Sequence, residues 1–392
     1  MKRRNFLQGT SVILLGSLAF GCRPQATPIK IELLKDSVPV QMVSKFRQEF
    51  SNPQAINFIP QARLKDLYNL LQRETENPEA DQSLLQYLYN LLGWEKENAA
   101  DQSRSDLVMI GDYWLTEAIQ QGLVQPLDPK AWERWNQLPP QWQALVTRNR
   151  QGKLDPEGEV WGAPYRWGTT VIAYRRDQFE SLGWTPQDWG DLWREEIRDR
   201  FSVLNSPRET IGLTLKKLGS SYNTTNLDQV DGLEEELRQL NRRVKLYDSD
   251  TYLKPLITGD TWLAVGWSTD FPEKFRRQHN IGVVVPASGT ALWADVWVQP
   301  ASEKPVSEIP LAQAWIDFCW RPEIATQMSL LTGTTSPIVV KMNPKDLPET
   351  LQTNPLLLPK AEILDRSEFL LPLEESTLKQ YQSLWQEMRQ KR

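Results

Sequence analysis

Short apolar runs alternate along the chain with segments of helical period. Extended runs occur in IKIELL (29–34), DLVMI (106–110) and, as two runs, VWGAPYRWGTTVIAYRRD (160–177), whereas VQMVSKFRQEF (40–50) places its apolar residues on one helix face. Further strands are predicted in RVKLYD, TWLAVGW, IGVVVP and ALWADVWV, and helices at 307–332 and in the C-terminal tail. This alternation predicts an α/β fold whose sheets carry helices on both faces.

One predicted strand, ALWADVWVQP (291–300), carries an acid between two tryptophans. Because side chains of a strand alternate, Trp293, Asp295 and Trp297 share one face. An indole covers methylene groups and attracts cations, and a carboxylate pairs with an ammonium group, so this face suits an organic cation. The alternative is structural: Asp295 receives a backbone N–H or an internal arginine, and both tryptophans pack in the core.

Composition narrows the class of protein. The chain has 392 residues, of which 40% are hydrophobic and 24% charged, and this fits two domains or lobes. Its formal net charge of −5 argues against nucleic acid or an anionic membrane as the main partner. His279 is the only histidine, which excludes histidine-rich metal sites. We expect no metal, no cofactor and no catalytic residue. The apolar surroundings of Cys319 predict that its thiol is buried and inert.

The first 22 residues predict an export signal, because a basic start precedes a short apolar run and small residues before Cys22. Residues 3–7 (RRNFL) resemble a twin-arginine export motif, for which an ordinary basic start is the alternative. Gly21 and Cys22 resemble the end of a lipoprotein signal and predict lipidation of Cys22. Residues 23–28 predict a linker. We expect export to the periplasm and membrane contact only through this lipid anchor.

Residues 73–105 form a distinct acidic segment around a short apolar helical pattern. Its simplest interpretation is a helical excursion on the surface. A lid or a partner-docking segment is the alternative.

Seven stretches in register resemble the extracellular solute-binding proteins of ABC importers, in the branch that binds polyamines. They are GDYWLTEAIQQGLVQPL (111–127), VWGAPYRWGTTVIAY (160–174), DWGDLW (188–193), RETIGLTLKKLGSSYNTT (208–225), LAVGWSTD (263–270), GTALWAD (289–295) and AQAWIDFCWRPEIATQMSLLTGTTSP (312–337). The resemblance covers most of the chain from about 107 to 337 and leaves the acidic segment without a counterpart.

This resemblance implies a periplasmic-binding-protein fold of type II, with two α/β lobes joined by crossing strands and a ligand held between them. Each lobe would contain a mixed sheet flanked by helices. The predicted division of the chain is lobe 1 at 29–166, lobe 2 at 167–285, a return to lobe 1 at 286–337, and a helical tail at 338–392 on lobe 2.

The resemblance also implies ligand-binding residues. Trp293, Asp295 and Trp267 match family residues that contact ligand, and Tyr113 matches a tyrosine that lines the cleft, with Trp114 beside it. Glu209 matches a glutamate that binds a terminal ammonium group.

Two of the implied acids have local alternatives. Ser206, Pro207 and Glu209 also form the pattern of a capping box, which would explain Glu209 without a ligand. Asp36 occupies the place of a family carboxylate after the first strand, but an exposed loop acid that caps the next helix would look the same.

The chain departs from the polyamine-binding pattern at several positions. Aromatic or polar family residues are replaced here by Leu34, Ser37, Ser206, Thr334 and Leu370. A binding site with fewer carboxylates can pair with fewer ammonium groups of a ligand. The departures therefore favour a shorter diamine, another organic cation or a larger ligand over spermidine.

The leading hypothesis is a monomeric, non-catalytic capture protein that binds a small cationic solute and delivers it to the membrane permease of an ABC importer. One alternative is the same fold reused as a non-transport sensor or assembly factor that docks through 73–105. Others are an exported glycosidase with a carboxylate pair, and iron(III) or oxyanion binding.

Overall fold

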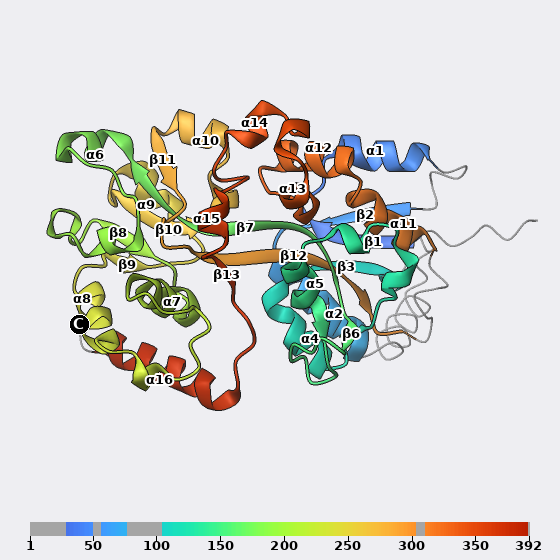
Figure 1. The fold of residues 1–392 in the computed structure, drawn as a ribbon, viewed down its shortest axis with the longest axis horizontal. Coiled ribbons are helices and arrows are strands. Elements are labelled where there is room, and N and C mark those ends of the chain that lie inside the picture. The colour runs from blue at the N-terminus through green and yellow to red at the C-terminus, as the bar shows by residue number, and fades with distance from the viewer. Residues whose placement is uncertain (1–28, 50–55, 77–103, 303–309, 391–392) are drawn as a thin grey trace, which may run out of the picture.

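Two long strands run through the middle of the molecule and connect its two lobes (Figure 1). They are β7 (Ala163–Arg175) and β12 (Ala291–Pro300), which pair with each other in antiparallel fashion. The structure is a computed structural model that describes residues 29–49, 56–76, 104–302 and 310–390. The two extended runs predicted within 160–177 form the short β6 (Glu159–Val160) and the single long β7.

β7 changes partners along its length, which is how it joins the lobes. Up to Thr169 it pairs with β12, and from Thr170 it pairs with β10 (Leu263–Trp267) and, near its end, with β11 (Ile281–Val284). The sheet order is β2-β1-β3-β12-β7-β10-β8-β9. β1 lies parallel to β2 and β3, whereas β12 lies antiparallel to both β3 and β7.

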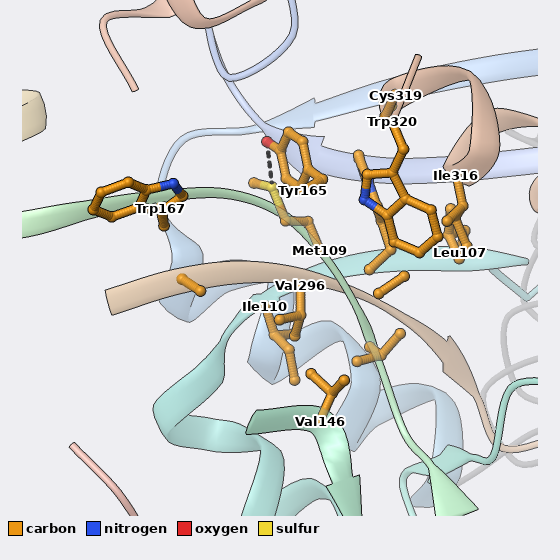
Figure 2. Close-up of a cluster of buried hydrophobic side chains, with 14 of the residues drawn as sticks. Leu107, Met109, Ile110, Val146, Tyr165, Trp167, Val296, Ile316, Cys319 and Trp320 are labelled. Atoms are coloured by element: carbon orange, nitrogen blue, oxygen red, sulfur yellow. Dashed lines mark hydrogen bonds between the residues drawn. The ribbon is translucent and has the colours of Figure 1, made fainter. Parts of the chain in front are cut away.

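The first lobe is centred on β3 (Leu107–Gly111), all of whose residues are buried. A continuous apolar run is typical of a central strand whose two faces are both covered. Side chains of β3, β7, β12 and α11 (Pro310–Cys319) meet in this core, where the Tyr165 hydroxyl donates to Met109 Sδ at 2.9 Å (Figure 2). Trp297 stacks on Tyr165 with ring centroids 4.8 Å apart, so this tryptophan is part of the core.

The second lobe has its own core, to which β7 contributes Val171 and Ile172. A smaller cluster lies where α16 (Glu375–Gln390) packs on α7 (Pro207–Lys217) and α8 (Leu233–Asn241) through Tyr381 and Met388. Figure 1 shows α16 beneath these two helices, far from the first lobe's α1 (Val40–Gln48). The segment before α16 contributes Ile338 and Leu347 to the first core, so the chain after 337 serves both lobes.

The remaining elements frame these cores. The other strands are β1 (Ile29–Leu34), β2 (Ile56–Gln61), β4 (Val124–Gln125), β5 (Thr147–Arg148), β8 (Phe201–Val203), β9 (Leu246–Tyr247) and β13 (Glu368–Phe369). The other helices are α2 (Leu64–Glu76), α4 (Leu115–Gln120), α5 (Pro140–Val146), α6 (Arg176–Leu182), α9 (Leu253–Thr258), α10 (Glu273–Gln278), α12 (Pro322–Thr332), α13 (Pro337–Lys341), α14 (Glu349–Gln352) and α15 (Ala361–Leu364).

Several predictions concern residues outside the described part of the chain. The export signal with Cys22, the linker at 23–28 and residues 77–103 of the acidic segment all lie there, whereas residues 73–76 form the last turn of α2. Within the described residues, no helix is both long enough and apolar enough to cross a membrane.

Candidate ligand-binding site

Three residue pairs line one face of the crossing strands where β7 changes sheets. Asp295 of β12 lies opposite Arg166, Trp293 lies opposite Gly168, and Trp267 of β10 lies opposite Thr170. Alternate residues of a strand share a face, and directly paired residues point to the same side. The three pairs therefore form one row of side chains, with Arg166 and Thr170 on the order of 13 Å apart along β7.

Trp293 lies against Gly168 at the centre of this row. A β-carbon at residue 168 would approach Trp293 Cζ2 to 2.3 Å and Ser268 Oγ to 2.6 Å, so only glycine leaves room for the indole. The Trp293 side chain is half-buried, and its Nε1 has no hydrogen-bond partner within the described structure.

Asp295 is already paired with an internal arginine. Nε and Nη2 of Arg166 both approach Asp295 Oδ2, at 2.6 and 2.5 Å. Asp295 is 1% exposed and Arg166 8%, so the pair is removed from water. This is the structural alternative foreseen for Asp295, and it satisfies the charge of that carboxylate without a ligand.

Glu209, at the other end of the row, has no such partner. Its carboxylate accepts from Thr170 Oγ1 at 3.0 Å and from Trp267 Nε1 at 3.3 Å, and the described structure shows no ion pair with it. Neighbouring Arg208 instead donates to the Leu371 carbonyl and to Asn223 Oδ1, both at 2.9 Å. Burial raises the pKa of Glu209 to about 7, against the opposing effects of its hydrogen bonds and of the more distant charge of Arg208.

The predicted capping box at Glu209 forms only in part. Ser206 is the N-cap of α7, and its hydroxyl accepts from the Glu209 backbone N–H at 3.4 Å. The Glu209 carboxylate points instead to Thr170 and Trp267. Helix capping therefore explains the position of Ser206 but not the direction of the Glu209 side chain.

Trp267 completes the second lobe's part of the row. It is half-buried at the end of β10, and its backbone N–H donates to the Tyr252 hydroxyl at 3.1 Å. Tyr252 also donates to Asp270, a carboxylate whose pKa is raised by burial. Because a β-carbon at Gly266 would meet Tyr252, this tyrosine lies on the opposite face of β10 from Trp267.

Tyr113 and Trp114 lie in a 3₁₀ turn directly after β3. The Tyr113 ring folds over Gly111, the residue opposite Asp295, yet the side chain is 56% exposed. The side of the ring that packs on Gly111 is out of water, and this partial desolvation, together with the carboxylates of Asp295 and Asp112, raises the pKa of Tyr113. Tyr113 therefore stands at the first lobe's end of the row.

Trp114 turns toward the first core rather than toward the row. Its ring stacks on Tyr68 of α2, with centroids 5.1 Å apart and an interplanar angle of 11°. This packing orients the short turn that carries Tyr113.

Asp112 holds the turn that carries Tyr113 in place, and the sequence analysis did not predict this role. Its Oδ1 accepts from the Ala294 backbone N–H at 2.8 Å and so ties the Tyr113 turn to β12. It is 3% exposed, and burial raises its pKa to about 7. Its position directly after a buried strand and beside the predicted Tyr113 could have indicated from the sequence that Asp112 belongs near the site.

Asp36 lies at the same edge of the sheet but stays in solvent. It adopts a left-handed conformation with φ of 63° in the turn after β1, and its side chain is exposed. It does not cap α1, whose N-cap is Pro39. Because β1 and β3 are parallel and Ile31 pairs with Leu107, Asp36 and the Tyr113 turn leave the sheet at the same end.

Comparison with known proteins identifies the family to which the chain belongs. The family model for bacterial extracellular solute-binding proteins matches residues 103–367, more than half of the chain. The chain belongs to this family. The resemblance seen in the sequence is thereby confirmed, and the matched residues include every element of the row.

Among the relatives of this solute-binding protein is the spermidine/putrescine-binding periplasmic protein of Salmonella typhimurium. It is 26% identical over 264 residues, which cover 67% of this chain and 72% of the relative. The putrescine/cadaverine-binding protein of Pseudomonas aeruginosa is 27% identical over 260 residues, 63% of this chain and 72% of that one.

A solved structure shows the same fold. The spermidine/putrescine substrate-binding protein PotD of Streptococcus pneumoniae superposes with a TM-score of 0.73 at 20% identity, covering 93% of this chain and 99% of that one. The predicted periplasmic-binding-protein fold is therefore confirmed for this solute-binding protein, and its crossing strands join the parts of one mixed sheet that runs through both lobes.

Proposed function

We propose that this chain is the solute-binding component of an ABC importer and that it captures a polyamine or a similar organic cation between its lobes. The named relatives bind spermidine, putrescine or cadaverine. In this function the protein binds its solute reversibly, releases it unchanged and performs no catalysis.

One observation carries the proposal: Glu209 is a buried carboxylate that forms no ion pair with any described residue. It is 7% exposed, and its hydrogen-bond partners Thr170 and Trp267 are neutral. Leaving a carboxylate unpaired inside a protein costs several kcal/mol, and an ammonium group from a ligand would remove much of this cost. This cost supports our assignment of a ligand ammonium group to Glu209.

The neighbouring tryptophans suit the rest of such a ligand. Trp267 and Trp293 are half-buried and stand on the same face as Glu209, so their rings can cover methylene groups and attract an adjacent ammonium group. Tyr113 would contribute a further aromatic surface from the first lobe, whereas exposed Asp36 would add only long-range attraction.

Further parts of the proposal concern assembly and location. We propose that the lobes, divided as 29–166 with 286–337 and 167–285, close on the solute as a monomer, and that a membrane permease receives it. Residues 1–22 would direct export to the periplasm by the twin-arginine route, and a lipid on Cys22 would be the only membrane anchor.

Isothermal titration calorimetry with the mature protein tests the proposed binding. The panel contains putrescine, cadaverine, spermidine, lysine, a quaternary amine and several oligosaccharides. We expect at least one cation to bind and Glu209→Gln to weaken this binding at least about tenfold, since truncating a buried charged partner costs 2 kcal/mol or more. Glu180→Gln, an exposed change on α6, is the matched control. Binding of oligosaccharides alone, or of nothing, would refute the proposal.

A further inference from the structure

Arg166 is a fixed positive charge on the same row as the candidate ligand site. It lies two residues from Gly168, against which Trp293 packs, and four residues from Thr170, the partner of Glu209. Residues at these spacings on a strand share one face. The arginine is therefore part of the same surface as the tryptophans.

The guanidinium of Arg166 forms an ion pair with the nearest carboxylate, that of Asp295. Its Nε and Nη2 both reach Asp295 Oδ2, within 2.6 Å, and both side chains are at least nine-tenths buried. Such close contacts between charged groups are the strongest hydrogen bonds in proteins. An incoming ammonium group would have to displace Arg166 from Asp295 or lie beside its guanidinium.

Neither of the other acids near the row, Asp112 and Asp270, offers a free carboxylate to a second ammonium group of the ligand. Asp112 Oδ1 is occupied by the Ala294 backbone N–H, and its carboxylate is attracted by the charge of Arg148. Asp270 accepts from Tyr252, which lies on the opposite face of β10. Of the two carboxylates that belong to the row, Asp295 is held in an ion pair with Arg166, whereas no ion pair among the described residues includes Glu209.

We propose that Arg166 occupies the place of a second ligand ammonium, so that this protein selects organic cations with a single ammonium group over diamines and polyamines. This specificity rests on the proposed function, since it assumes that the ligand binds at Glu209. A second ammonium group on the ligand would meet the Arg166 guanidinium, and two like charges in a buried site repel each other strongly. A hydroxyl or carboxylate at that end would instead find a guanidinium donor.

Calorimetry on the unaltered protein gives the first test. Putrescine is compared with two four-carbon ligands that have one ammonium group, 4-aminobutanol and 4-aminobutyrate. We expect one of the two to bind at least tenfold more tightly than putrescine. Equal or tighter binding of putrescine would overturn the specificity while leaving the cation-binding function intact. Failure of every cation to bind would refute the function, and the specificity with it.

Variants at Arg166 test the same point from the protein side. Arg166→Gln frees the Asp295 carboxylate and should improve putrescine binding, relative to the better four-carbon ligand, at least tenfold. Arg166→Lys keeps the positive charge and should leave this ratio within threefold of its original value. An unchanged ratio in a folded Arg166→Gln protein contradicts the proposal.

A double variant covers the risk that Arg166→Gln does not fold. Arg166→Gln with Asp295→Asn replaces the ion pair by two neutral amides and removes the buried charge. It should accept putrescine better than the unaltered protein, because the repulsive guanidinium is gone, but less well than a folded Arg166→Gln protein. A double variant that still prefers the single ammonium group by the original ratio would overturn the role of Arg166.

Discussion

The indole of Trp293 lies over Gly168, the residue directly opposite it on the neighbouring crossing strand. A side chain at residue 168 would take the space of the ring, since its β-carbon would lie 2.3 Å from Trp293 Cζ2. This contact places an aromatic face at the point where β7 passes from one lobe to the other.

Gly168→Ala should therefore weaken ligand binding by displacing Trp293. Loss of an aromatic face beside a cation is worth about 1–2 kcal/mol, or roughly a five- to thirtyfold increase in Kd. Calorimetry with the best ligand of the panel measures this effect. Gly190→Ala is the control, because a β-carbon there would meet nothing within 4 Å. If Gly168→Ala and Gly190→Ala bind equally well, Trp293 does not contact the ligand.

Breaking the buried ion pair should destabilise the fold. Asp295→Asn leaves the Arg166 guanidinium buried without its counter-charge, and we expect the free energy of unfolding to fall by about 3–5 kcal/mol. Urea denaturation measures the loss. Arg166→Met combined with Asp295→Leu removes both charges and should recover most of the stability. A single variant as stable as the original protein would show that the pair is not sealed from water.

Glu209 should make the protein less stable as the pH rises from about 4.5 to 7. The folded-state pKa is raised by burial from an ordinary 4.5 to about 7. In this interval the folded protein binds more protons than the unfolded chain, so stability falls with rising pH, by about 3 kcal/mol in total, and changes little above pH 7. Denaturation across this range should show a shallower slope for Glu209→Gln. Identical slopes would contradict the raised pKa.

Asp112 contributes to the same slope and has to be separated from Glu209. Its pKa is also raised to about 7 by burial, so its effect on stability has the same sign. Asp112→Asn should remove its own share and leave that of Glu209.

Cation binding should strengthen as the pH rises from 6 to 8. A ligand ammonium group pairs with ionised Glu209, and with a pKa of about 7 the ionised fraction grows roughly tenfold over this range. Kd should fall in proportion, and binding at pH 6 should release a proton. Calorimetry in two buffers of different ionisation enthalpy detects that proton. Binding without pH dependence would place the cation elsewhere.

The C-terminal helix should be integral to the second lobe. The Tyr381 hydroxyl donates to the Tyr222 and Thr224 carbonyls at 3.1 and 3.2 Å, and its side chain is fully buried. Tyr381→Ala should cost about 3–5 kcal/mol and Tyr381→Phe about 1 kcal/mol. Leu378→Ala, on the exposed side of the same helix, should cost less than about 1 kcal/mol. Equal losses for Tyr381→Ala and Leu378→Ala would contradict this packing.

Local periodicity explains what could be predicted from the sequence. The run of four apolar residues at 107–110 predicted a strand covered on both faces, and the alternation in 291–300 placed Trp293 and Asp295 on one face. These properties depend only on residues near one another in the chain. The family resemblance then identified Glu209, Trp267 and Tyr113 as candidates.

The partners of those side chains depended on the tertiary structure. Asp295 meets Arg166, which is 129 positions away, and Thr170 meets Glu209, 39 positions away. Asp112 reaches the backbone of residue 294 across 182 positions. Such contacts follow from which strands become neighbours and in what register, including the irregularity between Asp295 and Val296.

The sequence by itself therefore determined the fold class, the faces of the strands and the residue types available for a cation. Only the tertiary structure decided that Asp295 is neutralised from within while Glu209 is not. The physical reason is that burial and pairing set the effective charge of a carboxylate, and both depend on groups that the folded chain brings together from distant positions.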